Sequence, residues 1–229
     1  MKRLVTVVTG GSRGIGAATC RRLAEDGHDV VVGYLGGAQA DEEAREVAEA
    51  VRRTGARSVC VRGDTSVEAV VERLFTAAER QLGPVTGLVN NAGVTGPFGR
   101  LADTDPSELR RVVEVNFLGT LLCSRRAARV MTARGGGVIV NVSSSAATFG
   151  GPGDHVHTTH SYAYAATKAA VDILTLGLAE ELRPDGIRVN AVAPDRPARP
   201  EEVAAAIAWL MSPEASYATG TVVRVSGGR

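Results

Sequence analysis

Residues 4–17 read LVTVVTGGSRGIGA, and this stretch decides the fold. A short apolar run leads into a glycine-rich turn and then an amphipathic segment, which predicts a buried strand followed by a helix. Gly10 permits the turn, Gly14 lets the backbone approach a diphosphate, and Gly16 lets the helix pack close to the strand. The free N–H groups and the dipole at the start of that helix favour an anion. We therefore expect a dinucleotide here; the alternative is a plain turn between strand and helix.

The same alternation of short apolar runs and longer amphipathic stretches continues to the C-terminus. Further strands are expected at residues 29–34, 58–61, 86–90, 137–142, 187–192 and 221–225. Helices are expected at residues 14–25, 41–53, 67–82, 106–132, 162–182 and 201–211. Apolar strands separated by helices predict a parallel seven-stranded sheet covered on both faces, a doubly wound α/β (Rossmann) fold. We expect residues 1–229 to form one domain, with ligands beyond the carboxyl ends of the strands.

Composition and charge narrow the function classes. The chain has 229 residues, of which 44% are hydrophobic and 22% charged, with a net charge of +1. These values fit one globular domain. A net charge this close to zero gives no excess of positive charge that would attract nucleic acid or an acidic membrane. Cys20, Cys60 and Cys123 are odd in number and far apart, so no disulfide framework is expected. No apolar run reaches the length of a signal-peptide core or a membrane span, and we expect a cytoplasmic protein.

A tyrosine and a lysine four residues apart carry the clearest chemical signal. Tyr164 and Lys168 lie in SYAYAATK, residues 161–168, and at this spacing they share one face of a helix. A neighbouring ammonium favours a phenolate and lowers a tyrosine pKa that is ordinarily about 10. The pair then suits a proton donor and acceptor near neutral pH. Tyr162 competes for this role, but its neighbour four residues on is Ala166. The alternative is a solvated lysine on an ordinary helix.

The charges around the expected nucleotide site favour NADP(H) over NAD(H). Sites that prefer NAD usually carry an acid at the end of the second strand. Here Tyr34 is followed by Leu-Gly-Gly, and the first acid is Asp41. Arg13 in the glycine turn can donate to a 2′-phosphate, unless it simply points into solvent. Asp64, after the third strand, can accept from the amino group of adenine, although it can also cap the next helix.

Taken in order along the chain, several short motifs resemble the short-chain dehydrogenase/reductase family. They are TGGSRGIG at residues 9–16, Asn90-Asn91-Ala92-Gly93, Asn116 in VNFLG, Ser144 in VSSS, and Tyr164 with Lys168. The resemblance extends to YATGT at residues 217–221 and VSGG at residues 225–228, so it covers almost the whole chain. Each motif alone is weak, but their joint order is specific. The subgroup to which the chain is most similar contains acyl-carrier-protein ketoreductases and glucose dehydrogenases.

The resemblance implies a role for each of four residues. Tyr164 would be the acid in carbonyl reduction and the base in alcohol oxidation, and Lys168 would lower its pKa and hold the nicotinamide ribose. Ser144 would donate to the substrate oxygen, in preference to the serines on either side, because the family places its serine second in the strand-end pair. Asn116 would hold a water that links Lys168 to solvent. The alternatives are a kink or cap within a long helix for Asn116 and a satisfied strand end for Ser144.

The resemblance also implies the cofactor, the substrate and the assembly. The cofactor is expected to be NADP(H), with NAD(H) as the alternative, and the substrate a small carbonyl compound or alcohol. A homotetramer or homodimer is expected, with contacts from the C-terminal strand and from Ala169, Ala170, Ile173 and Leu174, unless these belong to the monomer core. No metal, nucleic acid or membrane is expected to bind. The expected cofactor contacts are Gly10, Ser12, Arg13, Gly14, Ile15, Gly16, Tyr34, Asp64, Thr65, Asn91, Ala92, Gly93, Tyr164, Lys168 and Pro194.

Two segments depart from the family pattern, and the first precedes Tyr164. The chain from Ser144 to Tyr164 is longer than usual and carries Asp154 and three histidines, at positions 155, 157 and 160. These side chains could bind zinc, but their spacing matches no zinc motif. We expect instead a polar loop that shapes the substrate entrance.

The second departure follows Pro194. The family normally has Pro-Gly there, then a threonine that contacts the nicotinamide carboxamide and a mobile helical lid over the substrate. Here residues 195–200 read DRPARP and enter the next helix directly. The lid is either deleted from the chain or a mobile segment left out of the sequence, and we favour the second. An intact mass of 23.8 kDa would show a genuine deletion.

Two functions compete at this point. The first is a carbonyl reductase or alcohol dehydrogenase, which the ordered motifs favour. The second is a nucleotide-binding sensor or scaffold without turnover, which the absent lid favours. The substrate pocket wall is expected from Thr95 to Leu101, where Gly96, Pro97 and Phe98 indicate an apolar portion but no particular substrate.

Overall fold

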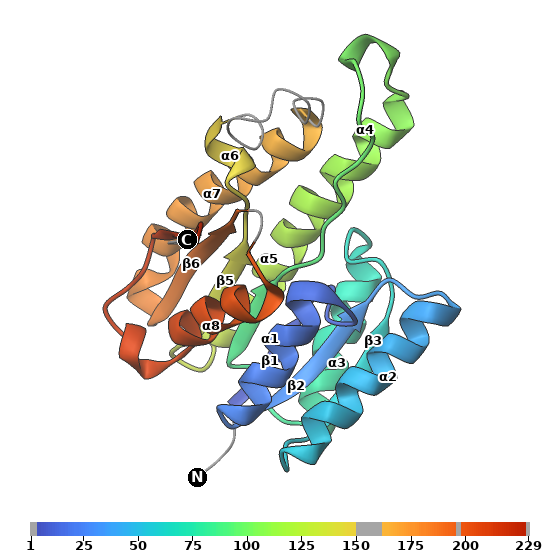
Figure 1. The fold of residues 1–229 in the computed structure, drawn as a ribbon. Helices are drawn as coiled ribbons and strands as arrows, with labels where there is room; N and C mark the ends of the chain where they lie inside the picture. The colour runs from blue at the N-terminus through green and yellow to red at the C-terminus, as the bar shows by residue number, and fades with distance from the viewer. Residues whose placement is uncertain (1–3, 150–161, 196–197, 228–229) are drawn as a thin grey trace.

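The computed structural model describes residues 4–149, 162–195 and 198–227. Within these ranges, seven parallel strands form one sheet in the order β3-β2-β1-β4-β5-β6-β7 (Figure 1). The strands are β1 (Leu4–Val8), β2 (His28–Tyr34), β3 (Ser58–Arg62), β4 (Gly87–Asn90), β5 (Gly137–Val142), β6 (Ile187–Pro194) and β7 (Val222–Val225). The strand order reverses between β1 and β4, and doubly wound folds bind their ligands at such a switch point.

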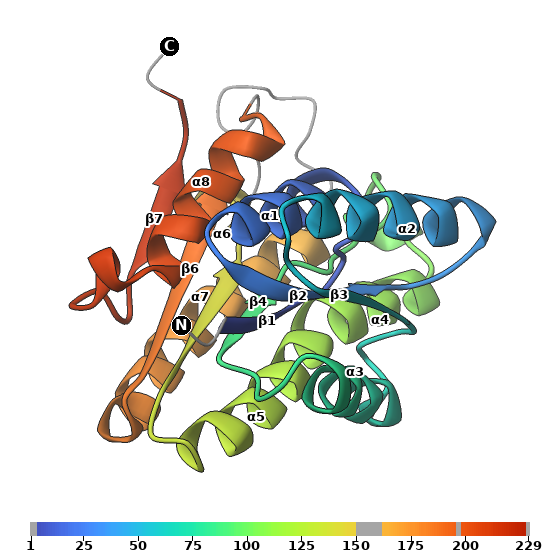
Figure 2. The same ribbon diagram turned by 90° about the horizontal axis from the view of Figure 1, so that it is seen from below.

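Helices cover both faces of the sheet (Figures 1 and 2). One face carries α1 (Gly14–Glu25), α2 (Ala38–Arg53) and α8 (Pro200–Met211). The other carries α3 (Glu68–Gln81), α4 (Pro106–Val113), α5 (Gly119–Thr132) and α7 (Tyr162–Leu182), and a single short turn, α6 (Ala146–Phe149), precedes α7. This architecture confirms the predicted doubly wound α/β fold with a parallel seven-stranded sheet.

Alternate residues of each strand feed two separate apolar layers, because successive strand side chains point to opposite faces. Val30 and Val32 of β2 pack with α1, α2 and α8, whereas Val31 between them packs with α3. All three valines are fully buried, as β-branched side chains in a sheet covered on both faces usually are. The apolar runs that predicted strands are therefore apolar because both faces of the sheet are covered.

Most predicted elements are confirmed to within two residues, and three differences have clear causes. Helix α2 begins at Ala38 and not at Asp41, because the N–H of Asp41 already donates to the carbonyl of Gly37 at 2.8 Å. Strand β6 runs on to Pro194, since this residue pairs with Val225 of β7. The helix predicted at residues 106–132 is divided by a π-helical turn at Glu114–Leu118.

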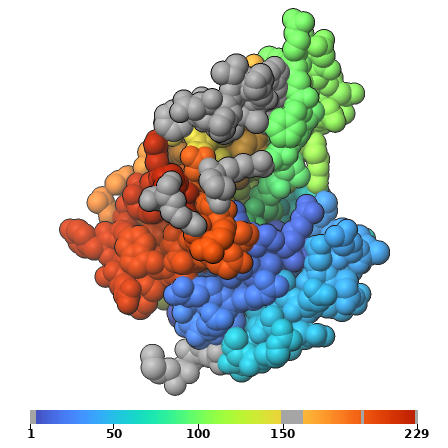
Figure 3. Space-filling view, in the orientation of Figure 1, coloured from blue at the N-terminus to red at the C-terminus, as the bar shows by residue number. Residues whose placement is uncertain are grey.

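The segment between β4 and α4 projects from the body of the molecule (Figures 1 and 3). It contains a 3-10 turn at Leu101–Asp103, and Asp105 caps α4 by accepting a hydrogen bond from the N–H of Ser107 at 2.7 Å. This projecting segment includes the predicted substrate wall. The wall therefore lies above the carboxyl ends of the central strands, on the side where the switch point opens.

Candidate active site

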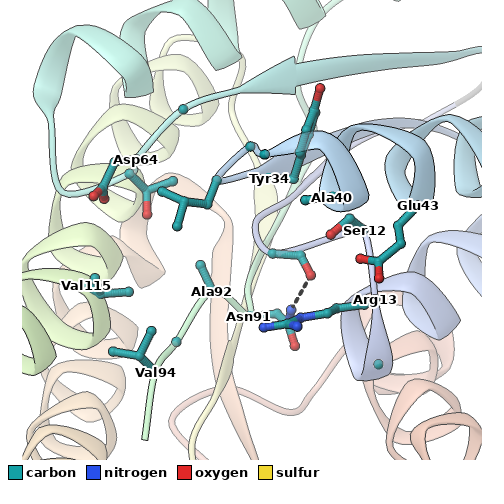
Figure 4. Close-up of a pocket in the computed structure, with 18 of the residues that line it drawn as sticks. Ser12, Arg13, Tyr34, Ala40, Glu43, Asp64, Asn91, Ala92, Val94 and Val115 are labelled. Atoms are coloured by element: carbon teal, nitrogen blue, oxygen red, sulfur yellow. Dashed lines mark hydrogen bonds between the residues drawn. The ribbon is translucent and has the colours of Figure 1, made fainter. Parts of the chain in front are cut away.

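A cavity of about 580 Å³ lies beyond the carboxyl ends of β1 to β4 (Figure 4). Its walls come from the glycine turn after β1, the loops after β2 and β3, the segment after β4, and the helical stretch that contains Arg111 and Val115. Eleven of the expected cofactor contacts line it: Gly10, Ser12, Arg13, Gly14, Ile15, Tyr34, Asp64, Thr65, Asn91, Ala92 and Gly93. The sequence motifs that are separated along the chain thus meet around one hollow.

The glycine turn has the open backbone that a diphosphate needs. A Cβ on Gly16 would lie 2.1 Å from the carbonyl oxygen of Gly10, so only glycine lets α1 start this close to the turn. Gly10 has a φ of +63°, which favours glycine. A Cβ on Gly14 would meet nothing within 4 Å, so the backbone at this position faces open space. These three positions fit a dinucleotide whose phosphates approach the start of α1.

Asn91 holds the turn in place. Its Nδ2 donates to the carbonyl oxygens of Thr9 and Gly10, both at 3.0 Å, and its backbone N–H donates to the hydroxyl of Thr9. Figure 4 shows this side chain beneath the glycine turn. The segment after β4 therefore fixes the shape of the turn as well as lining the cavity, a role that the sequence did not reveal.

The two ends of the cavity differ in charge. Asp64 lies at one end, and Arg13 and Glu43 lie at the other (Figure 4). Asp41, the first acid after β2, is directed elsewhere: its Oδ2 lies 3.6 Å from Arg62 Nη1. Two effects raise the pKa of Tyr34: partial burial has the larger effect, and a hydrogen bond to the Asp41 carboxylate has the smaller one. Asp41 is therefore already engaged by two neighbours.

Lys168 is buried at the end of β5, which contradicts the alternative of a solvated lysine. Its side chain is 4% exposed, and its Nζ donates to the carbonyl oxygen of Val142 at 2.7 Å. The same Nζ lies 5.7 Å from the centroid of the Tyr164 ring. Burial lowers the pKa of Lys168 to about 8, and the carboxylate of Asp172 opposes this shift. A buried ammonium beside a phenol is what the i, i+4 spacing on α7 predicts.

Asn116 lies fully buried in the π-helical turn and links three parts of the site. Its Oδ1 accepts from the N–H of Val94 at 2.8 Å, and its Nδ2 donates to the carbonyl oxygen of Val94 and to the hydroxyl of Thr167. A Cβ on Gly93 would lie 3.3 Å from Asn116 Oδ1 and 3.6 Å from Lys168 Nζ. Asn116 thus ties the segment after β4 to α7, next to Lys168. The predicted water between Asn116 and Lys168 stays a prediction.

The three serines after β5 have different partners. Ser143 is buried and donates to the backbone carbonyl of Lys168 at 3.3 Å, and Ser145 donates to Asp195 at 3.0 Å. Ser144 is half-buried, and within the described residues its Oγ accepts from the N–H of Ala146 at 3.2 Å. Because that bond uses a lone pair, the hydroxyl proton of Ser144 is available to a substrate oxygen. The role of Ser144 as donor to the substrate oxygen stays a prediction.

The remaining predicted residues lie outside the cavity or outside the described ranges. Gly16 packs against the turn, Tyr164 and Lys168 lie on α7, and Pro194 ends β6, where its carbonyl accepts from the N–H of Ser145 at 3.0 Å. The segment with Asp154 and its three histidines falls outside the described residues. In the part of the chain that the structure describes, no group of three or more potential metal ligands occurs.

A small apolar hollow lies where the predicted substrate wall meets the start of α7. Leu101 and Tyr162 line it together with Thr95, Pro97, Thr104, Leu109 and Ala163. A wider and more open hollow beside it is lined by Arg100, Leu101, Ala102 and Tyr162. The predicted wall at Thr95 to Leu101 therefore faces the helix that carries Tyr164.

Sequence reasoning missed three charged residues at the site. Arg111 pairs with Asp64 and lines the cavity, as does Glu43. Asp172 follows Lys168 by one helical turn, and burial raises its pKa against the effects of Ser143, Lys168 and Arg224. Helical spacing from Lys168 would have pointed to Asp172. Arg111 reaches Asp64 across 47 positions, which leaves no local signal, and nothing in the local sequence marks Glu43 as a cavity residue. Among the described helices, none is long and apolar enough to cross a membrane.

Comparisons with known proteins agree with the fold and with the motif order. The family model described as short chain dehydrogenase matches residues 4–197. A cis-4-hydroxycyclohexanecarboxylate dehydrogenase of Sinomonas cyclohexanicum is 41% identical, over 98% of this chain and 95% of that protein. A 3beta-hydroxysteroid dehydrogenase of Eggerthella lenta is 39% identical, over 100% of this chain and 94% of that protein. The crystal structure of a 3-ketoacyl-ACP reductase from Sinorhizobium meliloti is similar with a TM-score of 0.87 and 32% identity, over 98% of both chains.

Proposed function

Since the chain belongs to the short-chain dehydrogenase family, whose members are NAD(P)-dependent oxidoreductases of CH–OH and C=O groups, we propose that NADP(H) is its cofactor and Tyr164 its general acid and base. The observation that carries this proposal is the buried ammonium of Lys168, whose Nζ lies 5.7 Å from the Tyr164 ring. Burying a lysine lowers stability, and the adjacent phenol gives this costly charge a function.

The proposed mechanism assigns one task to each residue. When bound, the nicotinamide supplies or accepts the hydride. Ser144 donates a hydrogen bond from its hydroxyl to the substrate oxygen. This bond holds the substrate oxygen beside Tyr164. Tyr164 gives its proton to that oxygen in reduction and takes it back in oxidation, and the Lys168 ammonium favours the phenolate in between. Asn116 ties Val94 to Thr167 of α7, so that the lysine stays beside the phenol.

The preference for NADP(H) rests on the end of the cavity that contains Arg13. This guanidinium lines the cavity, and Asp41, the acid nearest to the end of β2, is engaged by Arg62 and Tyr34. Arg13 can therefore donate to a 2′-phosphate without competition from Asp41. Glu43 lines the same end and opposes this preference, because its carboxylate repels a phosphate. We give Arg13 the larger effect, since a guanidinium donates two parallel hydrogen bonds.

The substrate is proposed to be a carbonyl compound or secondary alcohol with an apolar ring or chain. Apolar side chains support this class, because Pro97, Leu101 and Tyr162 line the two hollows at the start of α7. The names of two relatives point the same way: one acts on a hydroxycyclohexanecarboxylate and the other on a hydroxysteroid. We propose cyclic secondary alcohols and their ketones as the first substrates to test.

Residues 1–229 are proposed to act as one domain, and the lid expected after Pro194 is proposed to be a mobile segment and not a deletion. The connector is held by the N–H of Asp195, which donates to the carbonyl of Val225, and by the N–H of Arg199, which donates to Glu202. The alignment with the Sinomonas enzyme spans 249 positions, more than the 229 residues of this chain, so that enzyme has residues without a counterpart here. An intact mass above 23.8 kDa would support the mobile-lid hypothesis instead of a deletion.

A homotetramer or homodimer is proposed, with α7 in the contact. Ile173 is 69% exposed and Leu176 45% exposed, and Leu118 and Leu121 of the neighbouring helical segment are also exposed. An exposed apolar row on helices is typical of an interface, and it weakens the alternative that these α7 residues belong to the monomer core. The cytoplasmic setting is likewise a proposal, supported by three cysteines that are all free thiols.

The competing function is a nucleotide-binding sensor or scaffold of the same fold. Activity with reduced cofactor separates the two. Purified protein is incubated with NADPH or NADH and a panel of cyclic ketones, β-ketoacyl thioesters and aldehydes, and the loss of reduced nicotinamide is followed by absorbance. We expect turnover with at least one ketone, and a higher kcat/KM with NADPH than with NADH. Tight cofactor binding without turnover across the panel would support the sensor.

A further inference from the structure

Asp64 lies at the end of the cavity opposite Arg13, and its carboxylate already has three donors. Oδ1 accepts from the N–H of Ser66 at 2.9 Å and from its hydroxyl at 2.7 Å. Oδ2 is paired with Nη1 of Arg111, which comes from α4 on the other side of the cavity. The bonds to Ser66 form a local turn and do not cap α3, whose N-cap is Val67 without a side-chain hydrogen bond, so the capping alternative is wrong. This turn leaves the bond from Arg111 without an explanation.

The Asp64 carboxylate lines the cavity and has acceptor capacity left on Oδ2. A carboxylate can accept about four hydrogen bonds, two on each oxygen. Oδ1 has both of its positions filled, whereas Oδ2 accepts only from Arg111 within the described residues. Partial burial works to raise the pKa of Asp64, but the Ser66 and Arg111 bonds outweigh it and hold the pKa below its usual value. The group is therefore ionised at neutral pH and accepts one more donor.

We propose that Arg111 is a positioning residue of the cofactor site: it orients Oδ2 of Asp64 so that the carboxylate selects the 6-amino group of adenine. This inference rests on the proposed function, because it takes the cavity to hold a dinucleotide. Both side chains line the same cavity, together with Thr65 and Val115, so the base would lie against the pair. Rotation of the Asp64 side chain is restrained on one oxygen by Ser66 and on the other by Arg111.

A structural ion pair is the competing interpretation. Arg111 is 38% exposed and Asp64 24% exposed, and pairs this accessible usually contribute little to stability. The pair joins the projecting α4 segment to the β3–α3 loop across the cavity, so it could only hold the two elements together. The two interpretations differ in one observable, which is discrimination between adenine and a base without the 6-amino group.

The experiment compares two reduced cofactors that differ at this position. One is NADPH, and the other is its 6-oxo analogue, in which hypoxanthine replaces adenine and presents an acceptor where adenine presents a donor. Kd is measured by cofactor fluorescence for the wild type, Arg111→Gln, Arg111→Lys and Asp64→Asn. Arg110→Gln is the matched control, because Arg110 is an exposed neighbour on the same helix that does not line the cavity. Should NADH bind more tightly than NADPH, the NADH pair of cofactors is used.

We expect the wild type to bind NADPH about 10-fold or more tightly than the 6-oxo analogue, because the carbonyl oxygen of the analogue cannot donate to the carboxylate and is repelled by it. Arg111→Gln and Asp64→Asn should each reduce this ratio to about 3-fold or less, with Arg111→Lys intermediate. Arg110→Gln should keep the full ratio. Binding of nicotinamide mononucleotide, which has no adenine, should be the same in the wild type and Arg111→Gln.

Three results would overturn the inference. The first is equal binding of both cofactors by the wild type, and the second is the full ratio in Arg111→Gln. The third is a loss of nicotinamide mononucleotide binding in Arg111→Gln that equals the loss of dinucleotide binding. The last two results would make the pair purely structural. A wild type that binds no reduced nicotinamide dinucleotide at all would contradict the proposed function itself, and this outcome is distinct from normal binding without discrimination.

Discussion

Replacing Lys168 with methionine is expected to stabilise the ligand-free protein while it removes activity. The lysine is fully enclosed, and its Nζ has the carbonyl oxygen of Val142 as a partner at 2.7 Å. Burial lowers its pKa from 10.5 to about 8, with Asp172 opposing the shift. A shift of this size corresponds to about 3 kcal/mol of lost stability at neutral pH, where the amine is charged in both states. Methionine fills the same space without a charge to desolvate.

The pH dependence of this effect has a definite sign. Below pH 8 the folded and unfolded chains both bind the proton, so the wild type carries the full cost. Between pH 8 and 10.5 the folded chain has lost the proton while the unfolded chain keeps it, so the stability of the wild type rises. The advantage of Lys168→Met should therefore shrink by about 3 kcal/mol across this window. Loss of the hydrogen bond to Val142 shifts the difference in unfolding free energy by a nearly constant amount at every pH. The pH dependence of that difference is therefore unchanged.

Urea unfolding of both proteins from pH 7 to pH 10.5 measures this difference directly, because every other titrating group is common to the two. Lys168 and Lys2 are the only lysines among 26 cationic residues, so lysine-selective carbon-13 labelling gives two signals and an independent pKa. Lys2→Arg identifies which signal belongs to Lys168. A difference in unfolding free energy that stays flat with pH, or a Lys168 signal that titrates near 10.5, would refute the reasoning.

The other predictions concern the cofactor site and its supports. Arg13→Gln should raise the Kd for NADPH by about 10- to 100-fold and that for NADH by less than about 3-fold, in fluorescence titrations; equal losses would refute 2′-phosphate binding. Asn116→Ala should lower the free energy of unfolding by about 2–4 kcal/mol, since the backbone N–H and the backbone carbonyl of Val94 each lose their hydrogen-bond partner. A change below about 0.5 kcal/mol in urea unfolding would contradict this. Gly16→Ala should unfold or loosen the first turn of α1, because its Cβ would lie 2.1 Å from a carbonyl oxygen. Gly177→Ala, in open space on α7, should instead stabilise by about 0.5–1 kcal/mol, and thermal unfolding of the two variants should diverge.

Local patterns predicted the elements well because each strand and helix of this fold carries its own apolar period. Strand β5 and helices α1 and α7 have the predicted bounds. The π-helical turn was not predicted. Asn116 within it bonds to the backbone of Val94, 22 positions earlier, and such a contact leaves no local pattern. A periodicity of 3.6 residues continues through the turn, so the sequence alone indicates one long helix.

In the candidate site too, local features could be predicted from the sequence and contacts between distant segments could not. The glycine turn and the Tyr164–Lys168 spacing are local, and the structure places them where the sequence predicts. The engagement of Asp41 by Arg62 and the pair of Arg111 with Asp64 join segments that are distant in the chain. No pattern within one segment encodes such pairs. The choice of Ser144 rested on family resemblance, and the separate partners of Ser143 and Ser145 now give it a physical reason.

The most direct test of the proposed chemistry compares Tyr164→Phe with Tyr162→Phe. Both tyrosines lie on the first turn of α7, and only Tyr164 has Lys168 one turn further on. For the wild type and both variants, kcat for ketone reduction and the Kd for NADPH are measured on the same preparations. We predict that Tyr164→Phe lowers kcat by at least about 100-fold with an unchanged Kd, and that Tyr162→Phe keeps kcat within about 3-fold. Substantial turnover in Tyr164→Phe, or an equal loss in Tyr162→Phe, would contradict the account.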